Sequence, residues 1–242
     1  MKIKLIKFFK DFFLYTGFLQ IFSSFNKVFL FISNFNRLEN WIKLNRKGLI
    51  IDDFYSLKRN YDKRYKLYQS LVSHYSFAEK EIVYVEFGVA EAHSFRWWAA
   101  HNTNPDSKFF GFDTFEGLPE NWGAFYKKGD MSSGMPDIDD VRAKFIKGIF
   151  QDTLPVFLDE TGNGLKIKQK IIHMDADLFS STIFVLSQLY RFLSKGDIIL
   201  FDEFNVANHE FFAFKIFTEA FYVKLRPVAA QNNFYQTAFV VE

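Results

Sequence analysis

The chain has 242 residues, of which 49% are hydrophobic and 24% charged, so it is long enough for one folded domain and too apolar to be disordered throughout. Its formal net charge is only +2, which predicts no nucleic-acid partner, because such a partner requires a strongly basic surface. The absence of cysteine excludes disulfides, thiolate zinc sites and a cysteine nucleophile, and it fits a cytoplasmic protein.

Aromatic residues make up 20% of the chain, and ten of its 34 phenylalanines lie in the first 35 residues. Most of these follow a set of basic residues: Lys2, Lys4, Lys7 and Lys10. On a helical wheel Lys10, Gly17 and Ser24 share one side, and the opposite side is almost entirely Phe, Leu and Ile. The segment is therefore predicted to form an amphipathic helix with a kink at Gly17.

Three interpretations of this N-terminal segment remain open. In the first, its apolar face packs on the body of the protein or on a second subunit, which would make a homodimer. In the second, residues 1–35 lie in the plane of a membrane, with lysines toward anionic lipid at the inner face. The third is a secretory signal or a single span, against which Asp11 and the lack of a small-residue cleavage site argue.

The next segment, residues 36–52, mixes charged residues with Asn and Gly and is interpreted as a connector. Residues 1–52 then form an extension, and residues 53–242 form the main domain. Apolar residues spaced by three and four predict a helix over residues 53–75. Basic residues occupy the other faces of that helix and are interpreted as a solvated surface: Lys58, Arg59, Lys63, Arg64 and Lys66.

From residue 81 onward, short apolar runs alternate with helical patterns. The predicted strands cover residues 81–87, 108–112, 143–149, 170–174, 197–201 and 237–241. The predicted helices cover residues 94–101, 138–144, 181–194 and 207–221. This alternation predicts an α/β fold built from parallel βαβ units with right-handed crossovers.

Acidic residues stand at or just past the C-terminal end of the first five predicted strands: Glu86, Asp113, Asp152, Asp175 with Asp177, and Asp202 with Glu203. Because ligands of open α/β sheets bind outside the carboxyl ends of the strands, we expect these side chains to share one site. Gly88 permits a tight turn after the first strand. Asp113 can accept both hydroxyls of a ribose, or alternatively cap the turn at residues 114–116.

The four carboxylates of Asp175, Asp177, Asp202 and Glu203 end neighbouring strands and would repel one another. A hard divalent cation, Mg²⁺ or Mn²⁺, would relieve that repulsion, since both prefer carboxylate oxygen. The alternative is that Asp177 or Glu203 pairs with a lysine or arginine.

Several segments resemble the macrocin O-methyltransferase family, whose members are class I methyltransferases that use S-adenosylmethionine and a divalent metal. The matching segments are residues 85–89, 111–120, 148–155, 173–182 and 202–204. The likeness runs in order over residues 60–242 and leaves residues 1–52 outside. It implies a Rossmann-like, doubly wound, seven-stranded sheet with an antiparallel last strand, here residues 237–241. The N-terminal helical extension precedes this sheet and lies outside the resemblance.

The resemblance also implies a role for each matching residue. Cofactor binding falls to Glu86, Gly88 and Ser94 at the amino-acid end, Asp113 with Thr114 at the ribose, and Gln151 with Asp152 beside the adenine. The metal positions are Asp175, Asp202 and Glu203, and the catalytic positions are Asp177, the candidate base, and Asp175. Two residues depart from the family pattern: Ala92 replaces a usual Gly, and Glu203 replaces a frequent Asp.

The expected reaction is metal-dependent methyl transfer to a hydroxyl of a sugar, a glycosylated small molecule or a glycan, with residues 121–137 as a lid over the acceptor. One alternative is a metal-dependent glycosyltransferase that uses Asp175-Ala176-Asp177 as a DxD motif. The other is a membrane-docked binding module without catalytic activity.

Overall fold

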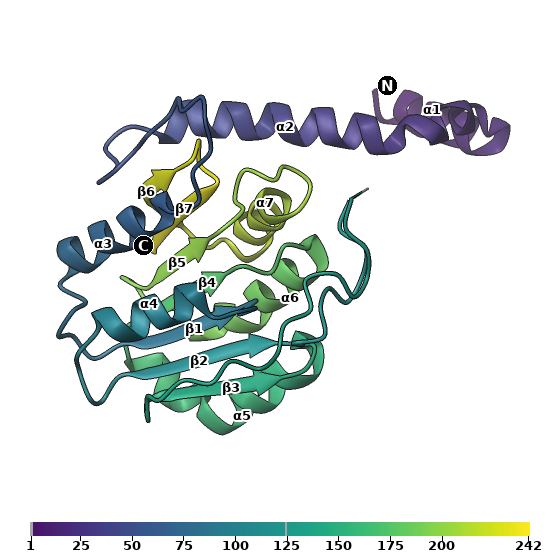
Figure 1. The fold of residues 1–242 in the computed structure, drawn as a ribbon. Coiled ribbons are helices and arrows are strands. Elements are labelled where there is room, and N and C mark those ends of the chain that lie inside the picture. The colour runs from purple at the N-terminus through teal and green to yellow at the C-terminus, as the bar shows by residue number, and fades with distance from the viewer. Residues whose placement is uncertain (1, 124) are drawn as a thin grey trace.

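A seven-stranded sheet with helices on both faces forms the centre of the molecule in the computed structural model, which describes residues 2–123 and 125–242 (Figure 1). The strands are β1 (Val83–Phe87), β2 (Lys108–Asp113), β3 (Ala143–Lys147), β4 (Lys170–Met174), β5 (Ile198–Phe201), β6 (Leu225–Gln231) and β7 (Gln236–Val241). The helices are α1 (Lys2–Thr16), α2 (Asn26–Asn45), α3 (Lys63–Tyr75), α4 (His93–His101), α5 (Phe150–Ile167), α6 (Phe179–Leu189) and α7 (Glu210–Phe221), with 3₁₀ helices η1 (Phe18–Phe25) and η2 (Tyr190–Phe192).

The strand order is β3-β2-β1-β4-β5-β7-β6. The first five strands of that order are mutually parallel, and β7 is antiparallel to both β5 and β6. This confirms the Rossmann-like doubly wound fold with seven strands and an antiparallel last strand. The order reverses between β1 and β4, which is where ligands bind in such sheets.

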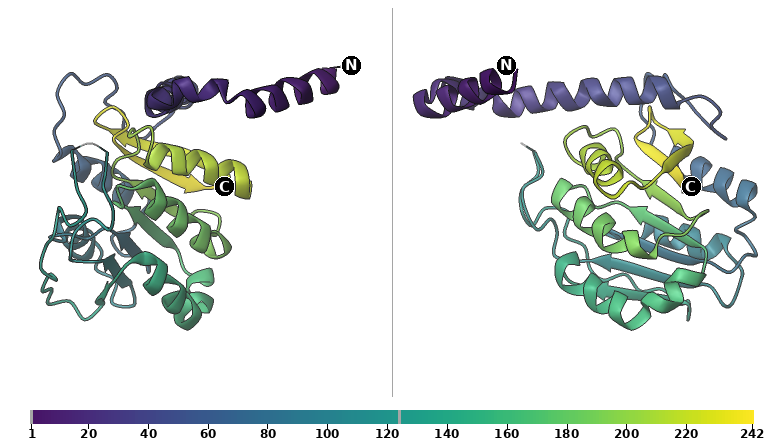
Figure 2. Two further views of the ribbon diagram at one scale, coloured as in Figure 1. Left: turned by 90° about the vertical axis from the view of Figure 1, so that its right-hand side faces the viewer. Right: turned by 180° about the vertical axis from the view of Figure 1, so that it is seen from behind.

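Each face of the sheet carries its own hydrophobic core. Side chains alternate along a strand, so Val83, Val85 and Phe87 of β1 enter one core while Tyr84 enters the other. Figure 2 shows α5, α6 and α7 on the first face and α3 and α4 on the second. Much of the phenylalanine outside the first 35 residues fills these two cores.

The C-terminal part of α2 packs on the first of these cores. Leu38 and Ile42 are buried there, and the ring of Trp41 lies 4.9 Å from that of Phe204. The side chain of Asn34 donates a hydrogen bond of 3.0 Å to Asn208. Upstream of Asn34, the chain extends away from the domain as α1, η1 and the first part of α2 (Figures 1 and 2).

Truncation of Trp41 to Ala is expected to lower the free energy of unfolding by about 2 kcal/mol, which is less than the 3–5 kcal/mol of a fully buried aromatic because Trp41 is only half-buried. The melting temperature should fall by about 4–8 °C, as measured by differential scanning calorimetry. Trp122 is the matched control, because it is also half-buried but lies in the cavity lining and outside the α2 contact; an equal shift for Trp122→Ala would contradict the anchoring role of Trp41.

Two predicted segments in the N-terminal half were wrong. Residues 36–45 of the supposed connector are helical, and the helix predicted over residues 53–75 begins only at Lys63. The segment of residues 46–62 instead contacts the turn between β6 and β7. The Ser56 amide donates a 2.6 Å hydrogen bond to Asn233 Oδ1, and the Asn60 amide donates a 3.0 Å hydrogen bond to Asn232 Oδ1. These contacts satisfy backbone groups that a helix would otherwise pair.

Other differences have identifiable causes. Residues 138–144 form a turn and the start of β3 rather than a helix, because the Arg142 guanidinium binds Asp140 and the backbone carbonyl of Asn102. Helix α5 was not predicted, because it contains Pro155 and two glycines, and these residues disfavour helices. Strand β6 was not predicted, because it contains Pro227. A proline is tolerated there because β6 lies at the edge of the sheet.

Candidate active site

A cavity of about 550 Å³ opens at the carboxyl ends of the parallel strands. The residues predicted from sequence that line it are Gly88, Asp113, Thr114, Gln151, Asp175, Asp177, Asp202 and Glu203. The remaining three predicted residues do not line it: Glu86 and Ser94 are buried behind it, and Asp152 is exposed in the first turn of α5. Most of the predicted strand-end residues therefore converge.

Gly88 holds the turn after β1 against the end of β4. Its φ of 92° lies in the left-handed region, and a Cβ built at this position would come within 1.8 Å of the Asp175 carbonyl oxygen. The Asp175 amide in turn donates a 2.9 Å hydrogen bond to the Phe87 carbonyl. The absence of a side chain at Gly88 thus lets the turn and the first acidic strand end share one wall.

Ala92 ends the same turn and precedes α4. Its φ of 62° is also left-handed, which a glycine adopts without steric cost, and its side chain is fully buried. The backbone at the family's usual glycine position therefore keeps a glycine-like conformation in this chain.

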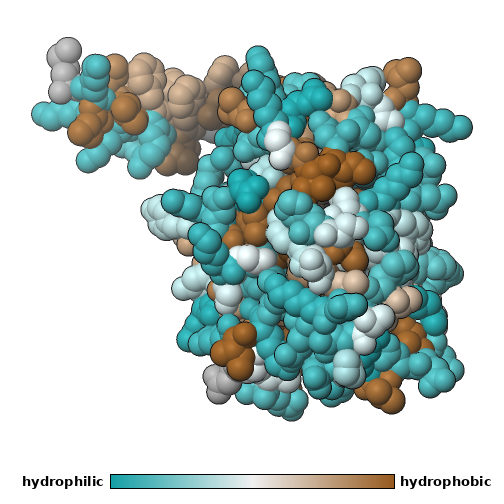
Figure 3. Space-filling model, turned by 90° about the vertical axis from the view of Figure 1, so that its left-hand side faces the viewer, coloured by the Kyte–Doolittle hydropathy of each residue, from teal (hydrophilic) through white to brown (hydrophobic). Residues whose placement is uncertain are grey.

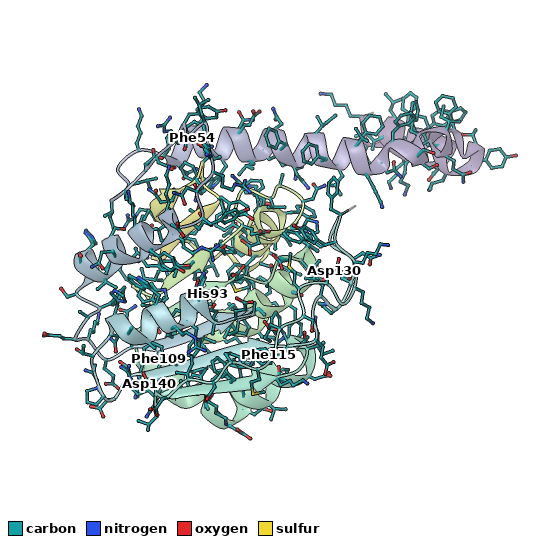
Figure 4. All side chains as sticks on the ribbon, in the orientation of Figure 1. Phe54, His93, Phe109, Phe115, Asp130 and Asp140 are labelled. Carbon is teal, nitrogen blue, oxygen red and sulfur yellow. The ribbon has the colours of Figure 1, made fainter. Side chains whose placement is uncertain are left out.

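The Asp113 carboxylate connects the turn to β2. Its Oδ2 accepts hydrogen bonds from the amides of Val89 (2.7 Å) and Ala90 (2.8 Å), and its Oδ1 accepts one from the Phe115 amide (2.7 Å). Figure 4 shows Phe115 just past the end of β2, opposite Phe109 at its start. Asp113 thus caps its own turn, which confirms the capping interpretation, and it also lines the cavity.

Burial and mutual repulsion raise the pKa values of the acidic cluster. Burial, and next the charge of Asp202, raise the pKa of Asp177 to about 7. Burial, and next the charge of Asp177, raise the pKa of Glu203 to about 8. Burial, and next the charge of Asp202, raise the pKa of Asp175 well above its ordinary value. The cluster therefore holds protons at neutral pH unless a cation binds it.

Two of the basic residues that were interpreted as a solvated surface, Arg59 and Arg64, line the cavity near this cluster. The Arg64 guanidinium lies 3.3 Å from Asp202 Oδ2, and its side chain is only 18% exposed. Arg59 lies over the Tyr235 ring at 3.7 Å, and the Tyr235 hydroxyl donates to Glu203 Oε1. The interpretation as a solvated surface was therefore wrong for Arg64, whereas Arg59 is exposed and also lines the cavity. Periodicity reveals neither contact, because Asp202 and Tyr235 are distant in the sequence.

The carboxylate oxygens of the cluster are suitable ligands for a hard cation. Asp202 Oδ1 and Glu203 Oε2 are buried and accept no hydrogen bond, so each has a free lone pair for a ligand. Within residues 2–123 and 125–242, however, no three His, Cys, Asp or Glu side chains are arranged to hold a metal ion. Arg64 supplies the positive charge beside Asp202 in this arrangement.

A buried polar network supports the wall behind the cavity. The Tyr84 hydroxyl donates a 2.7 Å hydrogen bond to Glu86 and lies 2.7 Å from His173 Nδ1. The Tyr68 hydroxyl lies 3.1 Å from Ser94 Oγ and 3.4 Å from His173 Nε2. Burial raises the pKa of Glu86 to about 8 and lowers that of His173 to about 3. The network is therefore neutral near pH 7, and it joins β1, β4, α3 and α4.

The metal-free protein is expected to lose stability as the pH rises from about 6.5 to about 8. Glu86 and Glu203 have pKa values of about 8 and Asp177 of about 7, against ordinary values of 4.5 and 3.8, so the folded state holds protons that the unfolded chain has released. Below pH 6.5 His173 acts in the opposite direction, because its pKa is lowered to about 3. Melting temperatures in EDTA at pH 6.5, 7.2 and 8.0 measure the slope; a rising series would contradict these shifts.

The strand order and the site at its reversal point define the fold of a class I methyltransferase. A model of macrocin O-methyltransferase (TylF) matches residues 94–228, which is more than half of the chain. The protein belongs to the macrocin O-methyltransferase family and is an S-adenosylmethionine-dependent O-methyltransferase. Family membership decides against both the glycosyltransferase and the non-catalytic alternatives.

Solved structures share the fold at low sequence identity. CalS11, described as a calicheamicin methyltransferase, is 19% identical with a TM-score of 0.55, over 86% of this chain and 91% of CalS11. The O-methyltransferase NovP is 18% identical with a TM-score of 0.51, over 74% of this chain and 78% of NovP. No curated protein sequence matched the chain.

Proposed function

We propose that this O-methyltransferase acts on a hydroxyl of a sugar, either free, in a glycosylated small molecule or in a glycan, and that it requires a divalent metal. The observation that carries the proposal is the contact of Gly88 with Asp175, which joins the cofactor turn to the acidic strand ends in one cavity. The family resemblance, and the description of CalS11 as a calicheamicin methyltransferase, support a sugar-bearing acceptor.

The cofactor residues of the proposal fall into two groups. Gly88, Asp113, Thr114 and Gln151 line the cavity and can touch S-adenosylmethionine. Glu86, Ser94 and Asp152 lie outside the lining, and for the first two the buried network supports a role in shaping the amino-acid end of the site.

The acceptor side is formed by the loop over residues 121–137. The rings of Trp122 and Tyr126 stack 5.0 Å apart and line the cavity with Met131. Aromatic surface beside a few polar groups is the usual composition of a small-molecule site. We propose that this loop covers the acceptor and excludes water during transfer.

Asp177 is the proposed base. Its pKa of about 7 suits proton transfer at neutral pH, and its carboxylate lines the cavity. The acceptor oxygen bonds to the methyl carbon as the carbon–sulfur bond of the sulfonium breaks, and the hydroxyl proton passes to Asp177. S-adenosylhomocysteine and the methyl ether are the products. Asp175 is the second proposed catalytic residue, placed beside Asp177 on the same strand end.

The proposed metal ligands are Asp175, Asp202 and Glu203, supported by the unpaired oxygens of the latter two. A bound Mg²⁺ or Mn²⁺ would lower the pKa of an acceptor hydroxyl. Asp202 would offer its unpaired Oδ1 to the cation, since Arg64 lies beside its other oxygen, Oδ2. Addition of Mg²⁺ or Mn²⁺ to metal-free protein should raise the melting temperature, and the Asp175→Asn variant should not respond. Equal responses of the two proteins would contradict this ligand set.

The acceptor class is tested by incubating the protein with radiolabelled S-adenosylmethionine and a panel of sugar glycosides, sugar nucleotides and catechols. Label is expected in a sugar-containing product, and EDTA should abolish its formation. Label only in the catechols would contradict the acceptor class, and undiminished transfer in EDTA would contradict the metal requirement.

A further inference from the structure

Residues 2–33 form an arm that the domain does not cover. Every residue from 2 to 33 is exposed except Phe13 and Gly17, which are half-buried. The aromatic contacts of the arm join its own phenylalanines to one another, for example Phe8 to Phe12 and Phe18 to Phe22. Figure 1 shows the arm extending beyond the sheet, and Figure 4 shows its side chains pointing outward on several sides of the helices. The arm therefore meets no intramolecular partner that would bury it.

The arm is apolar far beyond what an ordinary surface carries. Its exposed large hydrophobic residues begin at Ile3 and include Phe8 at 63%, Phe18 at 53% and Phe29 at 53% exposure. Figure 3 shows this brown surface at the upper left beside teal, hydrophilic atoms. Contiguous apolar surface of this kind marks an interaction site.

The distribution of charge in the arm selects the partner. The arm carries five lysines (Lys2, Lys4, Lys7, Lys10 and Lys27) and one acidic residue, Asp11. In α1, Lys4 and Lys7 share a face with Asp11, Phe8 borders that face, and Leu5, Phe9 and Phe12 lie farther round the helix. This pattern matches an interfacial helix with lysines reaching anionic headgroups. A second arm would offer only one acidic residue, Asp11, to pair with these five lysines.

The geometry also restricts how a bilayer would be contacted. No helix among the described residues is long and apolar enough to cross a membrane. The chain leaves the helical conformation at Gly17, whose φ is 61°, so α1 and η1 form separate short segments. Short segments of this kind lie along a surface. We propose that the arm docks in the plane of an anionic lipid bilayer and tethers the methyltransferase domain there through α2.

The proposal is tested with the full chain by co-sedimentation with vesicles of phosphatidylcholine alone or with added phosphatidylglycerol. Binding to the anionic vesicles is expected, and the Lys4→Gln, Lys7→Gln, Lys10→Gln triple variant should bind them about 100-fold more weakly, since each lysine near a charged surface contributes roughly fivefold. A second triple variant, Phe8→Ser, Phe9→Ser, Phe12→Ser, should no longer pellet with either vesicle.

The matched control removes exposed apolar residues from the domain: Leu57→Ser, Val141→Ser and Ile167→Ser, whose side chains are at least 84% exposed. This control should pellet like the wild type, and all variants should bind S-adenosylmethionine equally, which shows that the domain is folded. Failure of the wild type to pellet with anionic vesicles would overturn the proposal. So would a dimer in analytical ultracentrifugation that the phenylalanine variant abolishes while vesicle binding is unchanged.

Discussion

The Asp177→Asn variant is expected to have a kcat about 10²–10⁴-fold below that of the wild type, because an amide cannot take up the hydroxyl proton. Binding of S-adenosylmethionine should be preserved, since Asp177 is not among the proposed cofactor residues. The backbone should also be preserved: Asp177 has a φ of 56°, and asparagine is among the few residues that adopt this left-handed conformation readily.

The melting temperature of Asp177→Asn should rise slightly in the metal-free protein, because the charge of Asp177 is one cause of the raised pKa of Glu203. The control is Asp159→Asn, an exposed position on α5. Initial rates with the acceptor found in the panel, together with calorimetric titration of S-adenosylmethionine, separate the two effects. A kcat within threefold of wild type would exclude Asp177 as the base.

The Gly88→Ala variant is expected to lose both stability and cofactor binding. A Cβ at this position would lie 1.8 Å from the backbone oxygen of Asp175, and neither β1 nor β4 can move without breaking the parallel ladder that joins them. We expect a loss of at least about 3 kcal/mol in the free energy of unfolding and failure to bind S-adenosylmethionine.

Gly129→Ala is the matched control for this variant. Gly129 has a φ of 89°, against 92° for Gly88, and no atom lies within 4 Å of the position of its Cβ. The backbone strain of about 1–2 kcal/mol is therefore common to both variants, and only the steric clash differs. Equal melting temperatures for Gly88→Ala and Gly129→Ala would contradict the close contact of the cofactor turn with β4.

The sequence predicted the part of the fold that depends on local pattern. The β-branched run that forms β1 and the acidic residues that follow β4 and β5 placed the strand ends and their convergence correctly. The resemblance supplied the total of seven strands and the antiparallel direction of the last one, which periodicity alone does not give.

What the sequence could not predict depends on contacts between distant residues. The segment before α3 is non-helical because Asn232 and Asn233, more than 170 positions away, bind its backbone. Arg64 lies in the first turn of α3, and its partner Asp202 directly follows the distant strand β5, so their ion pair had no local signal. The arm was correctly predicted to be amphipathic and to break at Gly17, but its projection from the domain became visible only in three dimensions.

The most direct test of the shared cavity is a crystal structure with S-adenosylhomocysteine bound. The predicted result is a ligand within the cavity, with its ribose hydroxyls hydrogen-bonded to Asp113 and its sulfur facing the acidic cluster at Asp175 and Asp177. A ligand bound outside the cavity, or one whose sulfur points away from these carboxylates, would contradict the proposed site of methyl transfer.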